Sequence, residues 1–352
     1  MNIKITGTGS YIPSEIRKNQ DFINHQFLNT DGSLIAHPTP VIIEKFKKIT
    51  GIEERRYAAN QYKTSDLAFF AAEKAIKDAK IDPEKLDYLI VAQNFGDVGT
   101  NSTQGDAVPS IASRVKHKLK IKNPFCVAYD VLFGCPGWIE GMTQAYSFIK
   151  SGMASKCLII GAETLSRVTD PYDRDSMIYA DGAGAAIVEN TENGGGIISS
   201  ISASYTLEEA NFLFFGKTYH HTSEDTNMYI KMYGRKIYEF ALSQVPKAMK
   251  ACLDKGAIPI KNIKKILIHQ ANEKMDDAIV TRFYELYDMA VPEGIMPMTI
   301  QKLGNSSVAT IPTLYDLIIK GKVHGQSFQS GDILLFASVG AGMNINAFLY
   351  EY

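Results

Sequence analysis

The stretch VLFGCPGWIEGM, residues 131–142, places a cysteine between a strand-like run and a helical run. The residues before it, CVAYDVLFG, are rich in β-branched and aromatic side chains, whereas PGWIEGMTQAYSFIKSG after it has apolar residues at helical spacing. Proline suits the first turn of a helix because its missing N–H needs no partner there. The pattern predicts that Cys135 lies at a strand-to-helix turn, with Pro136 starting the helix and the cysteine at or beside the N-cap.

A cysteine at the start of a helix lies where thiols are activated. Unpaired N–H groups and the positive end of the helix dipole stabilise a thiolate and can lower a thiol pKa from about 8.5 to roughly 3.5–7.5. The same N–H groups can hold an oxyanion. The alternative is a buried structural cysteine, which we assign to Cys126, Cys157 and Cys252 because they lie in apolar strand or helix contexts. Cys135 is therefore the candidate nucleophile.

Length and composition limit the classes of protein that this chain can form. Its 352 residues exceed a single core of roughly 250–300, so one large or two closely packed domains are expected. A net charge of -1 gives no field that would attract nucleic acid. Four cysteines without CxxC spacing indicate reduced thiols. Without a signal-peptide pattern or a run of about 20 apolar residues, we expect a cytoplasmic protein with no membrane segment.

Short apolar runs alternate with segments of helical period, which is typical of α/β architecture with helices covering a sheet. Helices are expected over 65–79, with Ser65 as the capping residue, and over 237–255. The stretch 191–196 is a candidate seam, because strands and helices restart after it in an order that echoes the first half. Strands are expected at 87–93, 157–163, 184–189, 264–270 and 332–340.

Two further residues are candidates to act with the cysteine. His269 follows an apolar run and precedes a helix, which places it at the carboxyl end of a strand, where α/β sites gather. Asn305 could donate a hydrogen bond to a developing negative charge, although an asparagine beside a glycine is commonly turn chemistry. Gly340 and Gly342 allow either tight packing or N–H groups aimed at an oxyanion. No His, Cys and Asp spacing typical of zinc occurs, so no metal is expected.

These residues leave three functions open. An acyl-transferring enzyme and a hydrolytic enzyme would both use the chain order Cys135, His269, Asn305. Papain-like hydrolases share this order and a similar spacing of the cysteine and histidine, but their signature C-G-[SA]-C-[WY] is absent. A scaffold that keeps an enzyme fold without catalysis is the third possibility.

Six motifs follow one another along nearly the whole chain: GTGSYIP (7–13), TGIEERR (50–56), DPYDRDSMIYADGAGAAIV (170–188), HQAN (269–272), GNSSVATIP (304–312) and the glycine-rich end. In this order they resemble the ketoacyl synthase III family, the FabH-like condensing enzymes of the thiolase superfamily. The resemblance implies an α/β chain with the five-layered αβαβα thiolase fold. It further implies two similar halves: residues 1–190 carry the cysteine, and residues 191–352 carry the histidine and asparagine. A homodimer is implied as well.

The resemblance also implies a reaction, the decarboxylating Claisen condensation of an acyl thioester with a malonyl- or β-ketoacyl-carrier-protein thioester. Cys135 resembles the acyl-accepting nucleophile. His269 and Asn305 resemble the pair that stabilises the enolate-like oxygen formed on decarboxylation. The N–H groups of Cys135 and Ala341 are the expected oxyanion hole. No cofactor is expected, because phosphopantetheine of acyl carrier protein or coenzyme A carries the substrates of this fatty acid or secondary-metabolite synthesis.

Departures from the family pattern suggest a specialised branch, such as the enzymes that form dialkylresorcinol, cyclohexanedione or alkylquinolone precursors. Lys45 and Ile49 stand where the family has a tryptophan and an arginine for coenzyme A, beside an insertion at 24–39. Val108 stands where a large aromatic often caps the acyl pocket at the dimer interface, so a longer or bulkier acyl group is expected. Pro136 replaces the usual small residue after the nucleophile, and an alanine replaces one glycine of the final turn.

The expected partner is an acyl carrier protein, whose acidic surface would meet basic residues near the entrance. Lys274 stands where the family motif HQANxR has a docking arginine, and Arg174 lies in the motif at 170–188; both are candidates to bind substrate or carrier. The basic stretches 114–122 and 261–265 are further candidates, although such runs are commonly solvated surface. No nucleic-acid or membrane partner is expected.

Overall fold

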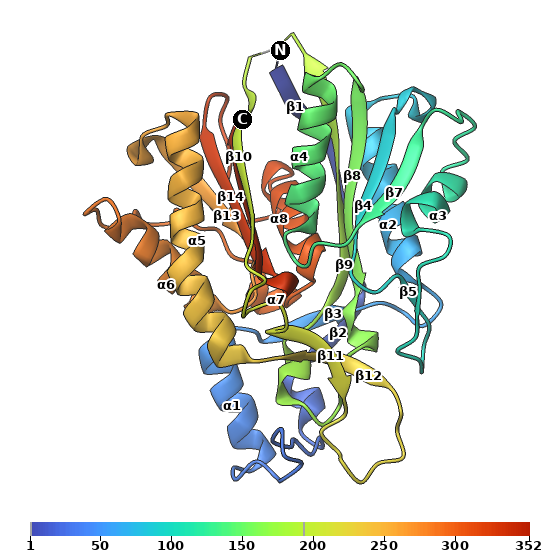
Figure 1. Cartoon of the computed structure of the whole chain (residues 1–352), viewed down its shortest axis with the longest axis vertical. Helices are drawn as coiled ribbons and strands as arrows, with labels where there is room; N and C mark the ends of the chain where they lie inside the picture. The colour runs from blue at the N-terminus through green and yellow to red at the C-terminus, as the bar shows by residue number, and fades with distance from the viewer. Residues whose placement is uncertain (1, 193) are drawn as a thin grey trace.

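Two β-sheets lie side by side with helices between them (Figure 1). The computed structural model describes residues 2–192 and 194–352. The first sheet has the strand order β1-β9-β8-β4-β7, and the second has the order β10-β15-β14-β13. The strands are β1 (Asn2–Tyr11), β4 (Tyr88–Ala92), β7 (Val127–Val131), β8 (Lys156–Thr164), β9 (Asp181–Thr191), β10 (Gly196–Ser204), β13 (Ile263–Ile268), β14 (Ile333–Gly340) and β15 (Asn344–Glu351).

Helices form three layers, one between the sheets and one on each outer face (Figure 1). In the central layer, Trp138 and Tyr315 pack against Phe336 and Phe348 of the second sheet. The resulting αβαβα order confirms the predicted thiolase fold. The central helices are α4 (Gly137–Lys150) and α8 (Thr310–Ile319); α2 (Thr64–Ala79) and α3 (Ile111–Lys118) cover the first sheet, and α5 (Gly234–Gly256) and α6 (Glu273–Glu285) cover the second.

Each sheet joins parallel strands to an antiparallel neighbour. In the first sheet β4 pairs in parallel with β7 and β8, and β9 runs antiparallel to β8. In the second, β13 and β14 are parallel and β15 is antiparallel. The five strands and two helices expected from apolar patterning are all present within a few residues. The division at residue 190 stays a prediction, and the seam at 191–196 includes Asn193, which lies outside the described residues.

One helix start differs from expectation. The helix α2 begins at Thr64, and its N-cap is Lys63 rather than Ser65. The Ser65 hydroxyl instead donates to Asp97 Oδ2 at 2.8 Å, so this serine joins the helix to the short strand beside it.

Shorter elements gather at one end of the two sheets (Figure 1). None of the helices in the described part of the chain combines the length and apolar character needed to cross a bilayer. The shorter elements are β2 (Glu15–Lys18), β3 (Glu54–Tyr57), β5 (Asp97–Val98), β6 (Gly105–Asp106), β11 (Leu213–Lys217), β12 (Met228–Met232), α1 (Thr39–Thr50) and α7 (Ile300–Leu303).

Candidate active site

Cys135 lies in the connection between the edge strand β7 and the central helix α4. The helix begins at Gly137, and Pro136 is its N-cap, with the carbonyl of Pro136 accepting a hydrogen bond from Glu140 N at 3.0 Å. Cys135 therefore directly precedes the N-cap, and the predicted strand-to-helix turn is confirmed. We expected Pro136 to be the first helical residue, but it is the N-cap, one position before the helix begins.

Two glycines allow this turn to contact the end of β14. Gly134 has a φ of 65°, and a Cβ on it would lie 2.5 Å from the backbone N of Ala341. A Cβ on Gly340 would lie 2.4 Å from the backbone N of Cys135. Only glycine fits at these two contacts, because a side chain at either position would overlap backbone atoms. The two amides expected to form an oxyanion hole thus lie on touching stretches of backbone, while their role stays a prediction.

One cavity of about 1160 Å³ contains the three predicted residues. Cys135 comes from the turn before α4, His269 from the carboxyl end of β13, and Asn305 from the loop after α7. An isolated β-bridge between Asn305 and Tyr179 holds the loop after α7 against the segment before β9. The fold therefore brings three side chains that are far apart in the sequence to one cavity.

His269 is buried and neutral. Only 4% of its surface is exposed, and its backbone N–H donates to Ala337 O at 2.9 Å. Burial lowers the pKa of the imidazole from 6.5 to about 4. A neutral imidazole has one N–H donor and one acceptor nitrogen. His269 can therefore donate a single hydrogen bond from its ring at neutral pH.

Asn305 is held so that its amide NH₂ is the group it can offer a ligand. Its side-chain Oδ1 accepts the backbone N–H of Ser307 at 2.8 Å. Its backbone is fixed at both polar atoms, by Ile178 O at 3.0 Å and by Ala180 N at 2.8 Å. Because the carbonyl oxygen is already bonded, the amide is oriented as a donor rather than as an acceptor.

Cys135 is a protonated thiol in this environment. The Ser307 hydroxyl donates to its Sγ at 3.2 Å, which lowers the pKa of the thiol. Burial has the larger and opposite effect, and raises that pKa from 9.0 to about 11. The expectation of a lowered pKa is therefore wrong for this site, because desolvation at the cavity wall outweighs the neighbouring hydrogen-bond donor.

Comparisons with known proteins identify the family of this chain. Models of 3-oxoacyl-[acyl-carrier-protein] synthase III match residues 129–205, and models of its C-terminal part match 253–352. A β-ketoacyl-[acyl-carrier-protein] synthase III of Vibrio vulnificus is 31% identical over 354 residues, covering 100% of each chain. This chain belongs to the ketoacyl synthase III family. The enzyme from Aquifex aeolicus is likewise 31% identical over 355 residues.

Solved structures place the ketoacyl synthase III chain in the same fold. The crystal structure of the Aquifex aeolicus synthase III is 30% identical, with a TM-score of 0.80 and coverage of 99% and 100% of the two chains. The priming β-ketosynthase of the R1128 polyketide pathway is 22% identical, with a TM-score of 0.80 and coverage of 99% and 96%. At that identity the likeness concerns the fold alone.

Basic side chains surround part of the ketoacyl synthase cavity. Arg174 lines it with 60% of its side chain exposed, and Arg235 and Lys236 at the start of α5 also line it. Lys45 and Ile49 also line it, from α1. The segment 24–39 contributes to the same wall through Leu28, Asn29, Thr30, Ile35 and His37.

Two predicted substrate or carrier residues lie outside this cavity. Lys274 is exposed at the start of α6, and its neighbours Asn272 and Met275 line the cavity instead. Val108 is 86% exposed and lines neither described cavity of its own chain. Either residue could therefore act in binding only by contacting a second protein chain at the surface.

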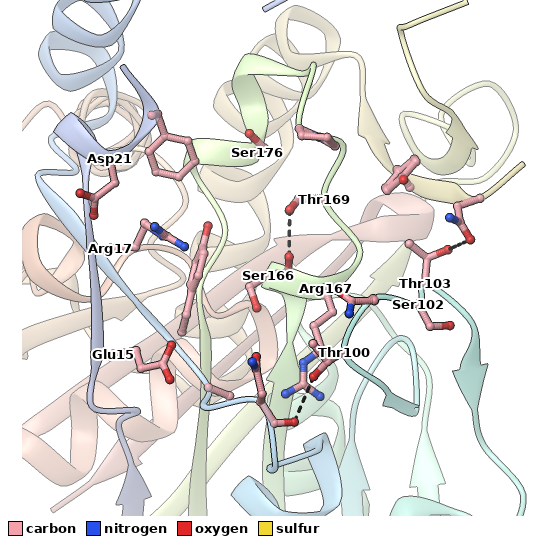
Figure 2. Close-up of a pocket in the computed structure, with 18 of the residues that line it drawn as sticks. Glu15, Arg17, Asp21, Thr100, Ser102, Thr103, Ser166, Arg167, Thr169 and Ser176 are labelled. Atoms are coloured by element: carbon pink, nitrogen blue, oxygen red, sulfur yellow. Dashed lines mark hydrogen bonds between the residues drawn. The ribbon is translucent and has the colours of Figure 1, made fainter. Parts of the chain in front are cut away.

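A smaller cavity of about 550 Å³ lies near the β2 and β3 strands (Figure 2). Figure 2 shows Arg17 and Asp21 on one wall and Thr103 on the opposite wall. The guanidinium of Arg167 donates to the carbonyls of Val98 and Tyr62, so this arginine joins two loops. None of the predicted catalytic residues lines this cavity, and no cluster of metal-ligating side chains occurs in residues 2–192 and 194–352.

Three residues beside the cysteine were not predicted as site residues. Ser307 donates to Cys135 Sγ, Asn94 Nδ2 lies 3.2 Å from Ser307 Oγ, and Asn94 Nδ2 lies 2.5 Å from Glu163 Oε1. A sequence signal existed, since Asn94 follows the expected strand 87–93 and Glu163 ends the expected strand 157–163. Polar residues at the carboxyl ends of neighbouring parallel strands converge at one edge of a sheet.

Proposed function

We propose that this chain condenses an acyl thioester, held covalently on Cys135, with a malonyl-carrier-protein thioester. The observation that carries the proposal is the convergence of Cys135, His269 and Asn305 on one cavity. Membership of the ketoacyl synthase III family supports it further. In this reaction Cys135 would accept the acyl group, and His269 and Asn305 would stabilise the oxygen that becomes negative on decarboxylation.

In the first step Cys135 Sγ attacks the thioester carbonyl. The new bond joins sulfur to the acyl carbon, the bond from that carbon to the carrier sulfur breaks, and the thiol proton ends on the departing carrier thiol. The N–H groups of Cys135 and Ala341, which lie on touching stretches of backbone, would donate hydrogen bonds to the tetrahedral oxyanion. A thiol with a raised pKa reacts through the small fraction present as thiolate, so donors near the sulfur matter.

In the second step a malonyl thioester loses CO₂. The carbon–carbon bond to the carboxylate breaks, and its electron pair moves to the thioester oxygen, which becomes enolate-like. The NH₂ of Asn305 and the ring N–H of neutral His269 are the donors available for this oxygen. A neutral imidazole can perform this task, because it keeps one ring N–H that can donate to the oxygen.

In the third step the enolate carbon attacks the acyl carbonyl on Cys135. Collapse of the tetrahedral intermediate expels the Cys135 thiolate and leaves a β-ketoacyl thioester on the carrier. The same backbone N–H groups serve this second oxyanion, so one arrangement of donors supports both carbonyl attacks.

Carrier recognition is assigned to the basic rim of the cavity. Arg174, Arg235, Lys236 and Lys45 offer cations to the phosphate of a phosphopantetheine arm. The exposed Lys274 would meet the acidic surface of an acyl carrier protein. We place the reaction in the cytoplasm, because a free nucleophilic thiol persists in a reducing compartment.

The size and apolar walls of the cavity favour an acyl group larger than a short primer. Its volume of about 1160 Å³ exceeds the roughly 300–1000 Å³ common for small-molecule sites. Ile42, Phe46, Leu213, Phe214 and Met232 are among its apolar lining residues. This supports a specialised branch of the family, of the kind that forms cyclohexanedione, resorcinol or quinolone precursors.

A homodimer is proposed through the edge strand β7. Large apolar side chains lie exposed on and beside this strand: Phe125 (84%), Val127 (46%) and Leu132 (69%). An exposed apolar edge strand is a ready template for pairing with a second chain. Val108 is exposed in the loop before α3, and in such a dimer it would face the partner rather than its own cavity.

The test is a product assay with labelled acyl thioesters and malonyl-acyl carrier protein. The proposal predicts a β-ketoacyl product that depends on the malonyl donor, is lost in Cys135→Ala, and falls strongly in His269→Ala and Asn305→Ala. A cysteine hydrolase would release free acid at the same rate without the malonyl donor. That result, or a product formed equally by Cys135→Ala, would contradict the proposal.

A further inference from the structure

A line of polar side chains, two of them buried, ends at the Cys135 sulfur, and none of its members is assigned a task in the three steps above. The Ser307 hydroxyl donates to Cys135 Sγ at 3.2 Å. Asn94 Nδ2 donates to Ser307 Oγ at 3.2 Å and to Glu163 Oε1 at 2.5 Å. Ser307 is 5% exposed and Glu163 is 1% exposed. Polar groups buried to this degree are retained where each has a partner.

In the arrangement of these contacts, each donor hydrogen of the line has an acceptor. An amide NH₂ has two hydrogens, and the Asn94 NH₂ directs one to Glu163 and the other to Ser307. A serine hydroxyl has a single hydrogen. Because its oxygen already accepts from Asn94, the Ser307 O–H is directed to the Cys135 sulfur.

The backbone fixes the same serine from the other side. Ser307 has a φ of 52°, in the left-handed region that residues other than glycine rarely adopt. Its N–H donates to Asn305 Oδ1 at 2.8 Å. One strained residue therefore orients the Asn305 amide with its N–H and approaches the Cys135 sulfur with its hydroxyl.

We propose that Ser307 is a catalytic residue that donates its O–H to the Cys135 sulfur, and that Asn94 and Glu163 are positioning residues for that hydroxyl. This rests on the proposed function of Cys135 as the acyl acceptor. The donor acts when the sulfur carries negative charge: before it attacks the acyl thioester, and again when the carbon–sulfur bond breaks and its electron pair returns to sulfur. No proton moves along the line.

Glu163 fulfils this role as a neutral acid. Burial raises the pKa of its carboxyl from 4.5 to about 8, so at neutral pH it accepts from Asn94 without carrying a charge. A negative charge on Glu163 would raise the pKa of the Cys135 thiol, which opposes thiolate formation. An uncharged acceptor therefore positions Asn94 while leaving the sulfur free to ionise.

The test measures the pH dependence of Cys135 alkylation by iodoacetamide, read by intact mass on the full chain with Cys135→Ala as the background. Losing a charge-assisted hydrogen bond should raise the apparent pKa of the thiol by about one to two pH units in Ser307→Ala, with an about 10- to 100-fold slower alkylation at neutral pH. Ser306→Ala is the matched control, because its hydroxyl contacts Thr310 instead. Asn94→Ala should resemble Ser307→Ala, and it carries the test if the latter does not fold.

Glu163 is tested with two variants that both lack an ionisable carboxyl. Glu163→Gln keeps an oxygen that accepts from Asn94, whereas Glu163→Leu does not. The proposal predicts a higher apparent thiol pKa in Glu163→Leu than in Glu163→Gln, and identical pKa values would overturn the role of Glu163. An unchanged profile in both Ser307→Ala and Asn94→Ala would overturn the donor itself. Because alkylation needs no thioester, these results are independent of whether Cys135 accepts an acyl group.

Discussion

At the scale of single residues, the candidate site combines two side chains that are both uncharged at neutral pH. Burial raises the pKa of Cys135 to about 11 and lowers that of His269 to about 4. The pair is therefore a thiol and a neutral imidazole rather than a thiolate and an imidazolium. In the proposed reaction such a pair suits decarboxylation, where His269 would donate a hydrogen bond, and it would make acyl transfer depend on the donors around the sulfur.

The buried imidazole should give the protein a specific pH dependence of stability. An unfolded histidine takes up a proton near pH 6.5, whereas folded His269 resists until about pH 4. Its contribution to the free energy of unfolding is thus complete above pH 6.5 and is lost as the pH falls towards 4, by on the order of 3 kcal/mol. Urea unfolding of wild type and His269→Gln across this range should give converging stabilities at low pH. Parallel curves would contradict the buried neutral state.

The contact between Gly340 and Cys135 predicts a second residue-scale effect. Gly340 has a φ of -166°, which any residue adopts, so the effect of Gly340→Ala arises from its Cβ meeting Cys135 N. We expect a stability loss of about 1–3 kcal/mol and slower acylation of Cys135. Gly99→Ala is the control, because no atom lies within 4 Å of its added Cβ. Normal acylation in Gly340→Ala would show that the two backbones need not touch.

At the scale of elements, several of the sequence motifs prove to be structural. Arg55 of TGIEERR is fully buried and donates to Met177 O at 3.0 Å, to Arg17 O at 3.1 Å and to Asn19 Oδ1 at 2.7 Å. In GTGSYIP, the hydroxyls of Thr8 and Ser10 donate to Asp316 of α8. Arg55 thus joins β3 to β2 and to the segment before β9, whereas Thr8 and Ser10 join β1 to α8, and none of these residues lines the cavity that contains Cys135.

A buried charge cluster fixes the loop that carries Arg174. Lys231 of β12 is 1% exposed and lies 2.6 Å from Asp170 and 3.2 Å from Asp173. Lys231→Met would leave both carboxylates without their cation, so we expect a loss of about 3–5 kcal/mol in the free energy of unfolding. Lys250→Met removes an exposed pair with Asp254 and should cost at most about 0.5 kcal/mol. Equal losses in urea unfolding of the two variants would contradict this account.

Local pattern was enough to predict the strands, the two long helices and the positions of Cys135 and His269 at strand ends. The line from Glu163 to Cys135 was not predicted, because it depends on the register of β4 against β8, in which Ala92 pairs with Gly161 and Asn94 comes beside Glu163. Register is set by packing across the whole sheet rather than by neighbours in the chain. The direction of the Cys135 pKa shift was wrong for a related reason, since burial depends on the assembled cavity.

At the scale of the whole molecule, the exposed apolar edge strand β7 of the first sheet predicts that two copies of the chain form a dimer. We expect wild type to sediment as a dimer, and Leu132→Asp to sediment largely as a monomer, because a charge would be placed beside the paired edge. Leu207→Asp is the matched control, since Leu207 is 94% exposed in the segment after β10. A monomeric wild type, or a dimer in Leu132→Asp, would exclude β7 as the interface.

The most direct measurement of the central claim is the intact mass of the protein after incubation with an acyl thioester, followed by a chase with malonyl-acyl carrier protein. We expect one acyl adduct, mapped to Cys135 and absent in Cys135→Ala, which disappears during the chase as a β-ketoacyl thioester forms. Acyl transfer through Cys135 to the malonyl donor is contradicted if no adduct forms, if the adduct maps to another residue, or if it is released as free acid at a rate that the malonyl donor does not change.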